Sequence, residues 1–179
     1  MARKPRKLKP ADLKDAALHY LGRYAASSAR VRQVLVRRIQ RSAKVHAFEP
    51  EPLLAELDRV IATLTGVGLL NDAAFAEAKA RSLNRRGGSK RQIAAKLAGA
   101  GVARETATEA LSQLNAEMPD AESAAALAFA KRRRLGVFRT PQDQTPERRR
   151  KDLMAMARAG FAFDLAKRAL AGAESEAQG

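Results

Sequence analysis

The chain has 179 residues, with 34 Lys and Arg against 19 Asp and Glu, so its formal net charge is +15 at pH 7. A protein this basic is expected to bind a partner rich in negative charge. The sequence contains no Cys, which excludes disulfides, thiolate-bound metals and cysteine nucleophiles. With only two His, a His-rich metal site is excluded as well, and neither a metal nor a cofactor is expected.

The two ends of the chain are predicted to lie outside the folded part. Residues 1–10 carry five bases and little that could be buried, which is typical of a basic disordered arm. They lack the apolar stretch of a signal peptide, and no segment approaches the roughly 18 apolar residues of a membrane span. We therefore expect a cytoplasmic protein with no membrane partner, and a frayed tail over residues 173–179.

Between the two ends, helix signals follow one another, and no segment shows the sustained alternation of a strand. Apolar residues recur at helical spacing. Most of these stretches follow a residue that favours a helix N-terminus, and several end at a Gly. The longest loop is expected at residues 137–145, around Pro141. Nine helices are predicted, beginning at Asp12, Ser27 or Ser28, Pro52, Asn71 and Ser89, running over residues 107–114, beginning at Asp120 and Thr145, and running over residues 165–170.

The helices repeat in threes. Residues 90–111 align with residues 149–170 without a gap, which places Gly101 on Gly160. Upstream, residues 75–83 align with residues 127–135, and Ser27 of a weaker first copy matches Ser89. A three-helix unit used three times predicts an elongated all-α tandem array, with repeats at residues 11–70, 71–118 and 119–172.

Ala occupies 39 positions and aromatic residues only 4% of the chain, so the helices are expected to approach one another closely. The apolar stripe of each helix should supply the interior. Twelve residues are predicted to be buried: Leu18, Val31, Leu35, Leu57, Ile61, Phe75, Ile93, Leu97, Leu111, Met156, Phe161 and Leu170.

Acids and bases are segregated along the repeat. No acid occurs in residues 16–48 or 78–104, whereas residues 105–130 contain five acids and no base. The first two helices of a repeat are thus basic and the third is neutral or acidic, which predicts an electropositive side suited to an extended polyanion or a filament. The bases expected to bind a filament or DNA are Arg32, Arg37, Arg38, Arg81, Arg85, Arg86, Lys90, Arg91, Lys96, Arg132, Arg133, Arg134, Arg148, Arg149, Arg150 and Lys151.

A family resemblance lies in the central repeat. Residues 68–76, Gly-Leu-Leu-Asn-Asp-Ala-Ala-Phe-Ala, continue through Arg81, Gly88, Ile93 and Leu97 to Gly101-Val102. This run resembles the central signature of the RecX family, bacterial regulators of the RecA recombinase, and the resemblance extends over residues 13–170. It implies a non-enzymatic modulator that lies in the groove of the RecA–DNA filament and inhibits its ATPase and strand exchange, in homologous recombination and the SOS response.

Alternatives to this interpretation stay open. A monomer is expected, whose partners are the RecA filament and single- or double-stranded DNA bound without sequence preference. The helix-turn-helix-like units could instead belong to an autonomous, sequence-tolerant DNA-binding protein. Both capping of filament ends and coating of their length fit the pattern. Tyr20 and Tyr24 could be core residues or base-stacking platforms. His19 is expected on a helix and His46 in a loop, and both are interpreted as ordinary surface or boundary histidines rather than general bases, so no catalytic residue and no enzyme activity is predicted.

Overall fold

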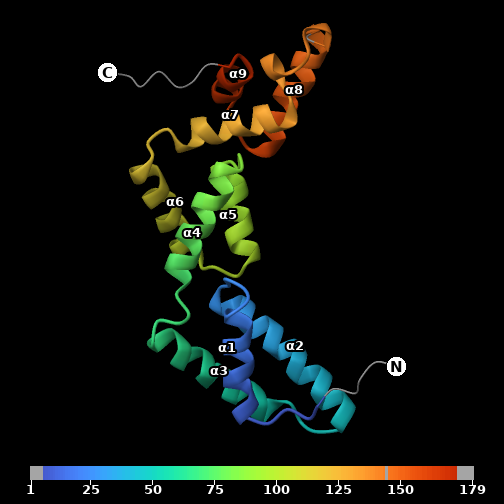
Figure 1. The fold of residues 1–179 in the computed structure, drawn as a ribbon, viewed down its shortest axis with the longest axis vertical. Helices are drawn as coiled ribbons and strands as arrows, with labels where there is room; N and C mark the ends of the chain where they lie inside the picture. The colour runs from blue at the N-terminus through green and yellow to red at the C-terminus, as the bar shows by residue number, and fades with distance from the viewer. Residues whose placement is uncertain (1–5, 144, 173–179) are drawn as a thin grey trace. The chain divides into compact units, whose positions relative to one another are not determined.

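The structure, a computed structural model, describes residues 6–143 and 145–172, and these contain nine α-helices and no strand (Figure 1). The all-α prediction is confirmed. Two single 3₁₀ turns, η1 (Gly136–Phe138) and η2 (Pro141–Asp143), lie in the predicted loop. The helices are α1 (Ala11–Leu21), α2 (Ser28–His46), α3 (Glu51–Gly66), α4 (Asp72–Arg85), α5 (Lys90–Gly99), α6 (Arg104–Glu117), α7 (Ala121–Arg133), α8 (Pro146–Ala159) and α9 (Phe163–Leu170).

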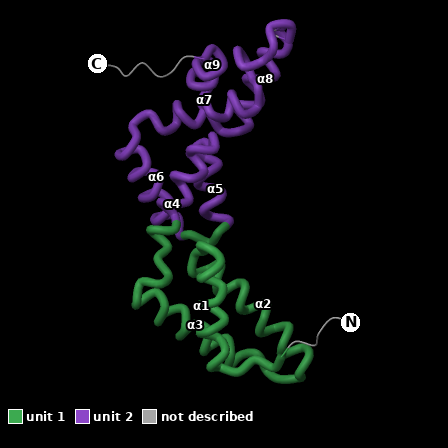
Figure 2. The backbone as a smooth tube through the Cα atoms, in the orientation of Figure 1, with its two compact units in different colours: residues 1–75, 100–102 green, residues 76–99, 103–179 purple. Residues whose placement is uncertain are grey.

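The chain forms two compact units (Figure 2). Unit 1 contains the described residues up to Phe75 together with the turn Ala100–Val102, and unit 2 contains the remainder. In unit 1, α1, α2 and α3 pack around an aliphatic core of Leu13, Val31, Leu35, Ile39, Leu53, Leu57 and Leu64. In unit 2, α7, α8 and α9 pack around Ala125, Ala126, Phe129, Met156, Phe161 and Ala166.

The corner between the second and third helices of a repeat recurs as the alignment predicts. Gly101 lies between α5 and α6 and Gly160 between α8 and α9, and both have left-handed backbone with φ of +77° and +94°. The residues that follow, Val102 and Phe161, are both buried. In the first three helices, Ala47 takes the left-handed position between α2 and α3, with φ of +48°. The equivalence of the corners confirms the repeat.

A buried Ser hydroxyl holds each Gly corner in place. In unit 1, Ser27 caps α2 by accepting from the Arg30 N–H at 3.2 Å, and its hydroxyl donates to the carbonyl of Ala100. In unit 2, Ser89 accepts from the Gln92 N–H at 3.2 Å and donates to the carbonyl of Ala159 at 2.5 Å. Each carbonyl belongs to the residue just before the corner glycine, so the same contact is used twice, as a tandem array requires.

Most of the predicted helix starts are confirmed. Ser27 and Thr145 are N-caps, and each side chain accepts a hydrogen bond from the backbone N–H three residues later. The Asn71 side chain accepts from the Ala74 N–H at 2.9 Å in the same way. Asp12 is different: it lies inside α1 and accepts from the Lys9 N–H at 2.8 Å. Asp120 precedes α7 but makes no capping bond through its side chain.

Three expectations need correction. Residues 6–10 are not a disordered arm, because Leu8 is buried and its N–H donates to the Ser42 hydroxyl at 3.1 Å. Residues 1–5 and the predicted tail at 173–179 lie outside the described residues.

The second correction concerns Leu18, which is 37% exposed rather than buried. About 100° of rotation separates successive helical residues, so Leu18 stands roughly 140° away from Leu13, which does face the core.

The third correction concerns the register of two helices. Overlaying residues 75–83 on residues 127–135 pairs Leu83, inside α4, with Leu135, beyond the end of α7. The ends of the helices give another pairing. The Gly88 N–H donates to the Leu83 carbonyl and the Leu135 N–H to the Ala130 carbonyl, so Leu83 corresponds to Ala130. Of the other residues expected to be buried, Ile61, Phe75, Leu111 and Leu170 are partly buried and seven are fully buried.

Candidate functional site

The Gly87-Gly88 turn that follows α4 packs against α7. A Cβ on Gly87 would lie 2.6 Å from the backbone N of Phe129, so the corner touches the backbone of α7 directly. The Arg132 guanidinium donates to the carbonyl of Arg86 across this contact. Phe129 is in turn packed edge-on against Phe161 at 5.6 Å between ring centroids. The helix ends that carry these bases are therefore held together by backbone packing.

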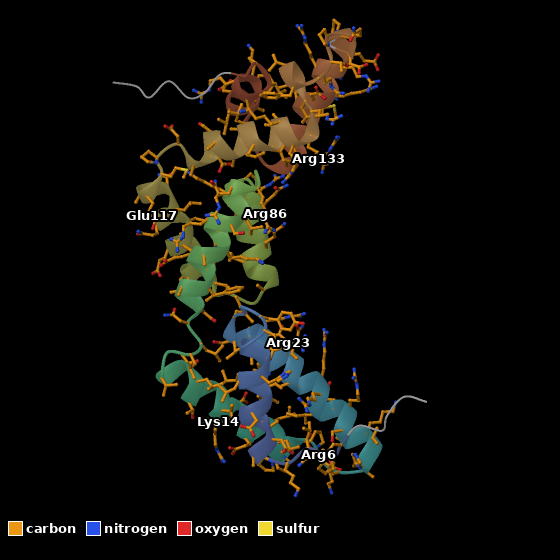
Figure 3. All side chains as sticks on the ribbon, in the orientation of Figure 1. Arg6, Lys14, Arg23, Arg86, Glu117 and Arg133 are labelled. Atoms are coloured by element: carbon orange, nitrogen blue, oxygen red, sulfur yellow. The ribbon has the colours of Figure 1, made fainter. Side chains whose placement is uncertain are left out.

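Three bases surround a cavity of about 120 Å³ at this corner: Arg86 after α4, Lys96 of α5 and Arg132 of α7. We call them the corner cluster. All three are exposed, and none forms an ion pair with an acid among the described residues. Arg133, labelled with Arg86 in Figure 3, is exposed beside them and lies over the Phe129 ring. Such uncompensated charge suits an anionic partner.

Two predicted site residues next to this corner are used inside unit 2 instead. The Lys90 ammonium donates to the Asn115 side chain at 3.0 Å, and the Lys90 N–H donates to Glu122 at 3.0 Å. The guanidinium of Arg91 donates to the Arg158 carbonyl at 3.0 Å. Burial raises the pKa of Glu122, although the Lys90 N–H acts in the opposite direction.

Three other predicted bases already have acidic partners within the chain. Arg32 pairs with Asp58 at 2.7 Å, Arg81 with Glu117 at 3.2 Å, and Lys151 with Glu147 at 2.7 Å. These exposed pairs reduce the charge that the three bases can offer a partner. The remaining predicted bases, all exposed and outside the ion pairs of the described chain, are Arg37, Arg38, Arg85, Arg134, Arg148, Arg149 and Arg150.

A second cationic site lies in the last three helices. A cavity of about 410 Å³ is lined by Arg139, Arg148, Arg149 and Lys167 together with apolar Val137, Leu153 and Leu170. Of these bases, Arg139 and Lys167 were missed by sequence reasoning. Arg139 lies inside the predicted loop of residues 137–145, and Lys167 has only Arg168 beside it in α9, so neither belongs to a dense basic run.

Asp152, on α8, lines this cavity and holds Arg139 in place. Its carboxylate is 3% exposed and accepts two hydrogen bonds from Arg139, at 2.6 and 3.0 Å, and one from the Gly136 N–H at 2.8 Å. Burial by itself would raise the pKa of Asp152, but these bonds outweigh it and the pKa lies below its ordinary value. The buried pair fixes the loop after α7 against α8. A carboxylate or phosphate could then approach the other three bases.

A metal site or a membrane span would place particular requirements on the described residues. Within residues 6–143 and 145–172, no three His, Asp or Glu side chains gather as metal ligands would. None of the helices in the described ranges has the length and apolarity needed to cross a membrane.

Fold and surface together define a class: an all-α protein of tandem three-helix repeats with an exposed cationic cluster at its central corner. The family model for the second three-helix domain of RecX matches residues 71–111. Regulatory protein RecX of Myxococcus xanthus is 44% identical over 168 residues, covering 94% of this chain and 89% of the relative. Regulatory protein RecX of Agrobacterium fabrum is 32% identical over 165 residues, covering 92% and 85%. The chain therefore belongs to the RecX family of regulatory proteins.

Solved structures show the same fold. The crystal structure of RecX from Lactobacillus salivarius superposes with a TM-score of 0.65 at 21% identity, covering 91% of this chain and 95% of that one. A second crystal structure of regulatory protein RecX gives a TM-score of 0.64 at 19% identity, covering 88% and 70%.

Proposed function

We propose that this protein is a non-enzymatic regulator of homologous recombination that binds the RecA–DNA filament and inhibits its ATPase and strand-exchange activities. The observation that carries the proposal is its kinship with regulatory RecX proteins over nearly the whole chain. It acts as a cytoplasmic monomer in recombination, repair and the SOS response.

The charge distribution supports this partner. The corner cluster offers bases that no acid of the described chain neutralises, whereas Glu105 and Glu109 of α6 are exposed acids. A filament of protein and DNA presents both signs of charge, so it can complement both surfaces. A protein that only wrapped DNA would gain nothing from the acids of α6.

Reversing two charges of the corner cluster tests the placement of the binding surface. In the Arg86→Glu, Lys96→Glu variant, inhibition of RecA strand exchange and ATPase is expected to weaken by about tenfold, because each exposed contact contributes about 0.5–1 kcal/mol. Lys90 is avoided, since its ammonium bonds Asn115. The concentration of protein that halves strand exchange gives the result.

The control carries the same change of charge elsewhere: Lys14→Glu, Arg59→Glu, at two exposed bases of α1 and α3. It should inhibit like the parent, and both variants should keep the parent's helical circular dichroism. Equal inhibition by parent and corner-cluster variant would show that this surface does not bind the filament. If the parent itself leaves RecA unaffected, the alternative of an autonomous DNA-binding protein replaces the proposal.

A further inference from the structure

Two aromatic residues, Tyr20 and Tyr24, lie together at the C-terminal end of α1. The backbone N–H of Tyr24 donates to the Tyr20 carbonyl at 3.0 Å, which turns the chain back on the helix end. The two rings lie 5.1 Å apart between centroids with their planes at 41°. Tyr20 packs against the core of unit 1, whereas Tyr24 is 53% exposed. The Tyr24 ring is therefore exposed to solvent and rests on the Tyr20 ring, which the core holds in place.

The sequence around this pair is basic. Arg23, labelled in Figure 3, lies between the two Tyr in the sequence, is exposed, and forms no ion pair within the described chain. The whole segment of residues 16–48, which contains the pair and α2, has seven bases and no acid. Proteins bind single-stranded nucleic acid with exposed aromatic rings beside Lys and Arg side chains. The ring stacks on a nucleobase, and the cations contact the phosphate backbone.

We propose that Tyr24, supported by Tyr20 and flanked by Arg23, is a stacking site for an unpaired base of single-stranded DNA. A base inside a duplex is already stacked on both faces, so the site discriminates single strands from duplex without reading sequence. This contact is separate from the corner cluster and needs no recombinase. It therefore goes beyond the proposed function and can fail independently of it.

The chain carries its own reporter for this site. Tyr20 and Tyr24 are the only two Tyr, and there is no Trp, so all tyrosine fluorescence comes from the proposed platform. Saturating the parent protein with oligothymidylate should quench this fluorescence, whereas an abasic strand of the same length should bind more weakly and quench little. Unchanged emission at saturating DNA, or no binding of the single strand at all, would overturn the proposal.

Affinity for labelled oligothymidylate, measured by anisotropy without RecA, separates the ring from other contributions. Tyr24→Ala should weaken binding by about fivefold to about 150-fold, the usual range for losing one ring–base stack. Tyr24→Phe keeps the ring and should stay within about twofold of the parent. Affinity for duplex DNA of the same length should be unchanged in both variants.

Phe163 supplies the matched control, because it is also exposed, at 66%, but lies at the start of α9 away from any aromatic partner in the described chain. Phe163→Ala should bind oligothymidylate like the parent. The proposal is wrong if Tyr24→Ala matches Phe163→Ala, or if Tyr24→Ala weakens RecA inhibition while leaving single-stranded DNA binding intact, since the pair would then contact protein. Inhibition by the corner-cluster variant is a separate measurement, so the two ideas fail separately.

Discussion

Replacing Asp152 with Ala is expected to destabilise the last three helices by about 3 kcal/mol, the usual cost of removing one partner from a buried ion pair. Arg139, only 21% exposed, would lose its bidentate partner, and the Gly136 N–H would lose its acceptor. Urea unfolding followed by far-ultraviolet circular dichroism measures the loss. Hydrogen exchange should show it first in residues 135–143, which the pair holds against α8.

The double variant Arg139→Met, Asp152→Leu is the control for this prediction. Val31 and Ile93 are buried at the equivalent positions of α2 and α5, so an aliphatic side chain suits the site. Apolar replacement of both partners is often neutral or stabilising, and it should recover most of the lost stability. A single variant as stable as the parent would mean that the pair contributes nothing.

The same carboxylate predicts a pH dependence. Because the pKa of Asp152 is lower in the folded protein than in the unfolded chain, its contribution is fully present above the unfolded pKa of about 4. The contribution is lost as the pH falls through the lower, folded pKa. The difference in unfolding free energy between parent and Asp152→Asn should therefore be constant from about pH 7 to 5 and shrink below about pH 4. A difference that changes near neutral pH would contradict this assignment.

Gly87→Ala is the second substitution with a large expected effect, a loss of about 2–4 kcal/mol. Gly87 has φ of +77°, and a Cβ there would meet the Phe129 backbone at 2.6 Å, where no side chain can move aside. The variant should separate the ends of α4 and α7, and with them Arg86 from Arg132. Thermal and urea unfolding measure the loss of stability.

Gly99→Ala is the matched control, because a Cβ at the end of α5 would meet nothing within 4 Å. It should leave stability unchanged or raise it by up to about 1 kcal/mol, as Ala has less backbone freedom than Gly in the unfolded chain. If Gly87→Ala is as stable as Gly99→Ala, the close approach of α4 to α7 is not needed for folding.

The fold could be predicted because its signals are local. Capping by Ser27, Ser89 and Thr145 and the left-handed turns at Gly101 and Gly160 depend on a few neighbouring residues. The errors came from tertiary contacts. Leu18 belongs to an apolar helix but lies off its buried face. Leu8 sits in a basic run but is buried in the core of unit 1, where its N–H also bonds the distant Ser42 hydroxyl.

The candidate site could likewise be predicted only where its features depend on the local sequence. The sequence identifies the bases but cannot show which of them already have partners, such as Arg32 with Asp58, because the partner comes from another helix. Nor can it show that Arg86, Lys96 and Arg132 meet, since three helices bring them together. Asp152 was missed because an acid next to Arg148–Lys151 is typical of a solvated helix face, whereas here it is buried by Arg139.

Binding to the assembled filament tests the central claim most directly. Fluorescently labelled protein would be titrated with RecA filaments on single-stranded DNA, with free RecA and with the same DNA alone, at one ionic strength. We predict that the filament binds at least about tenfold more tightly than either component, since neighbouring subunits can engage several surfaces of one molecule at once. Equal affinity for the filament and for bare DNA, or no binding to the filament, would contradict it.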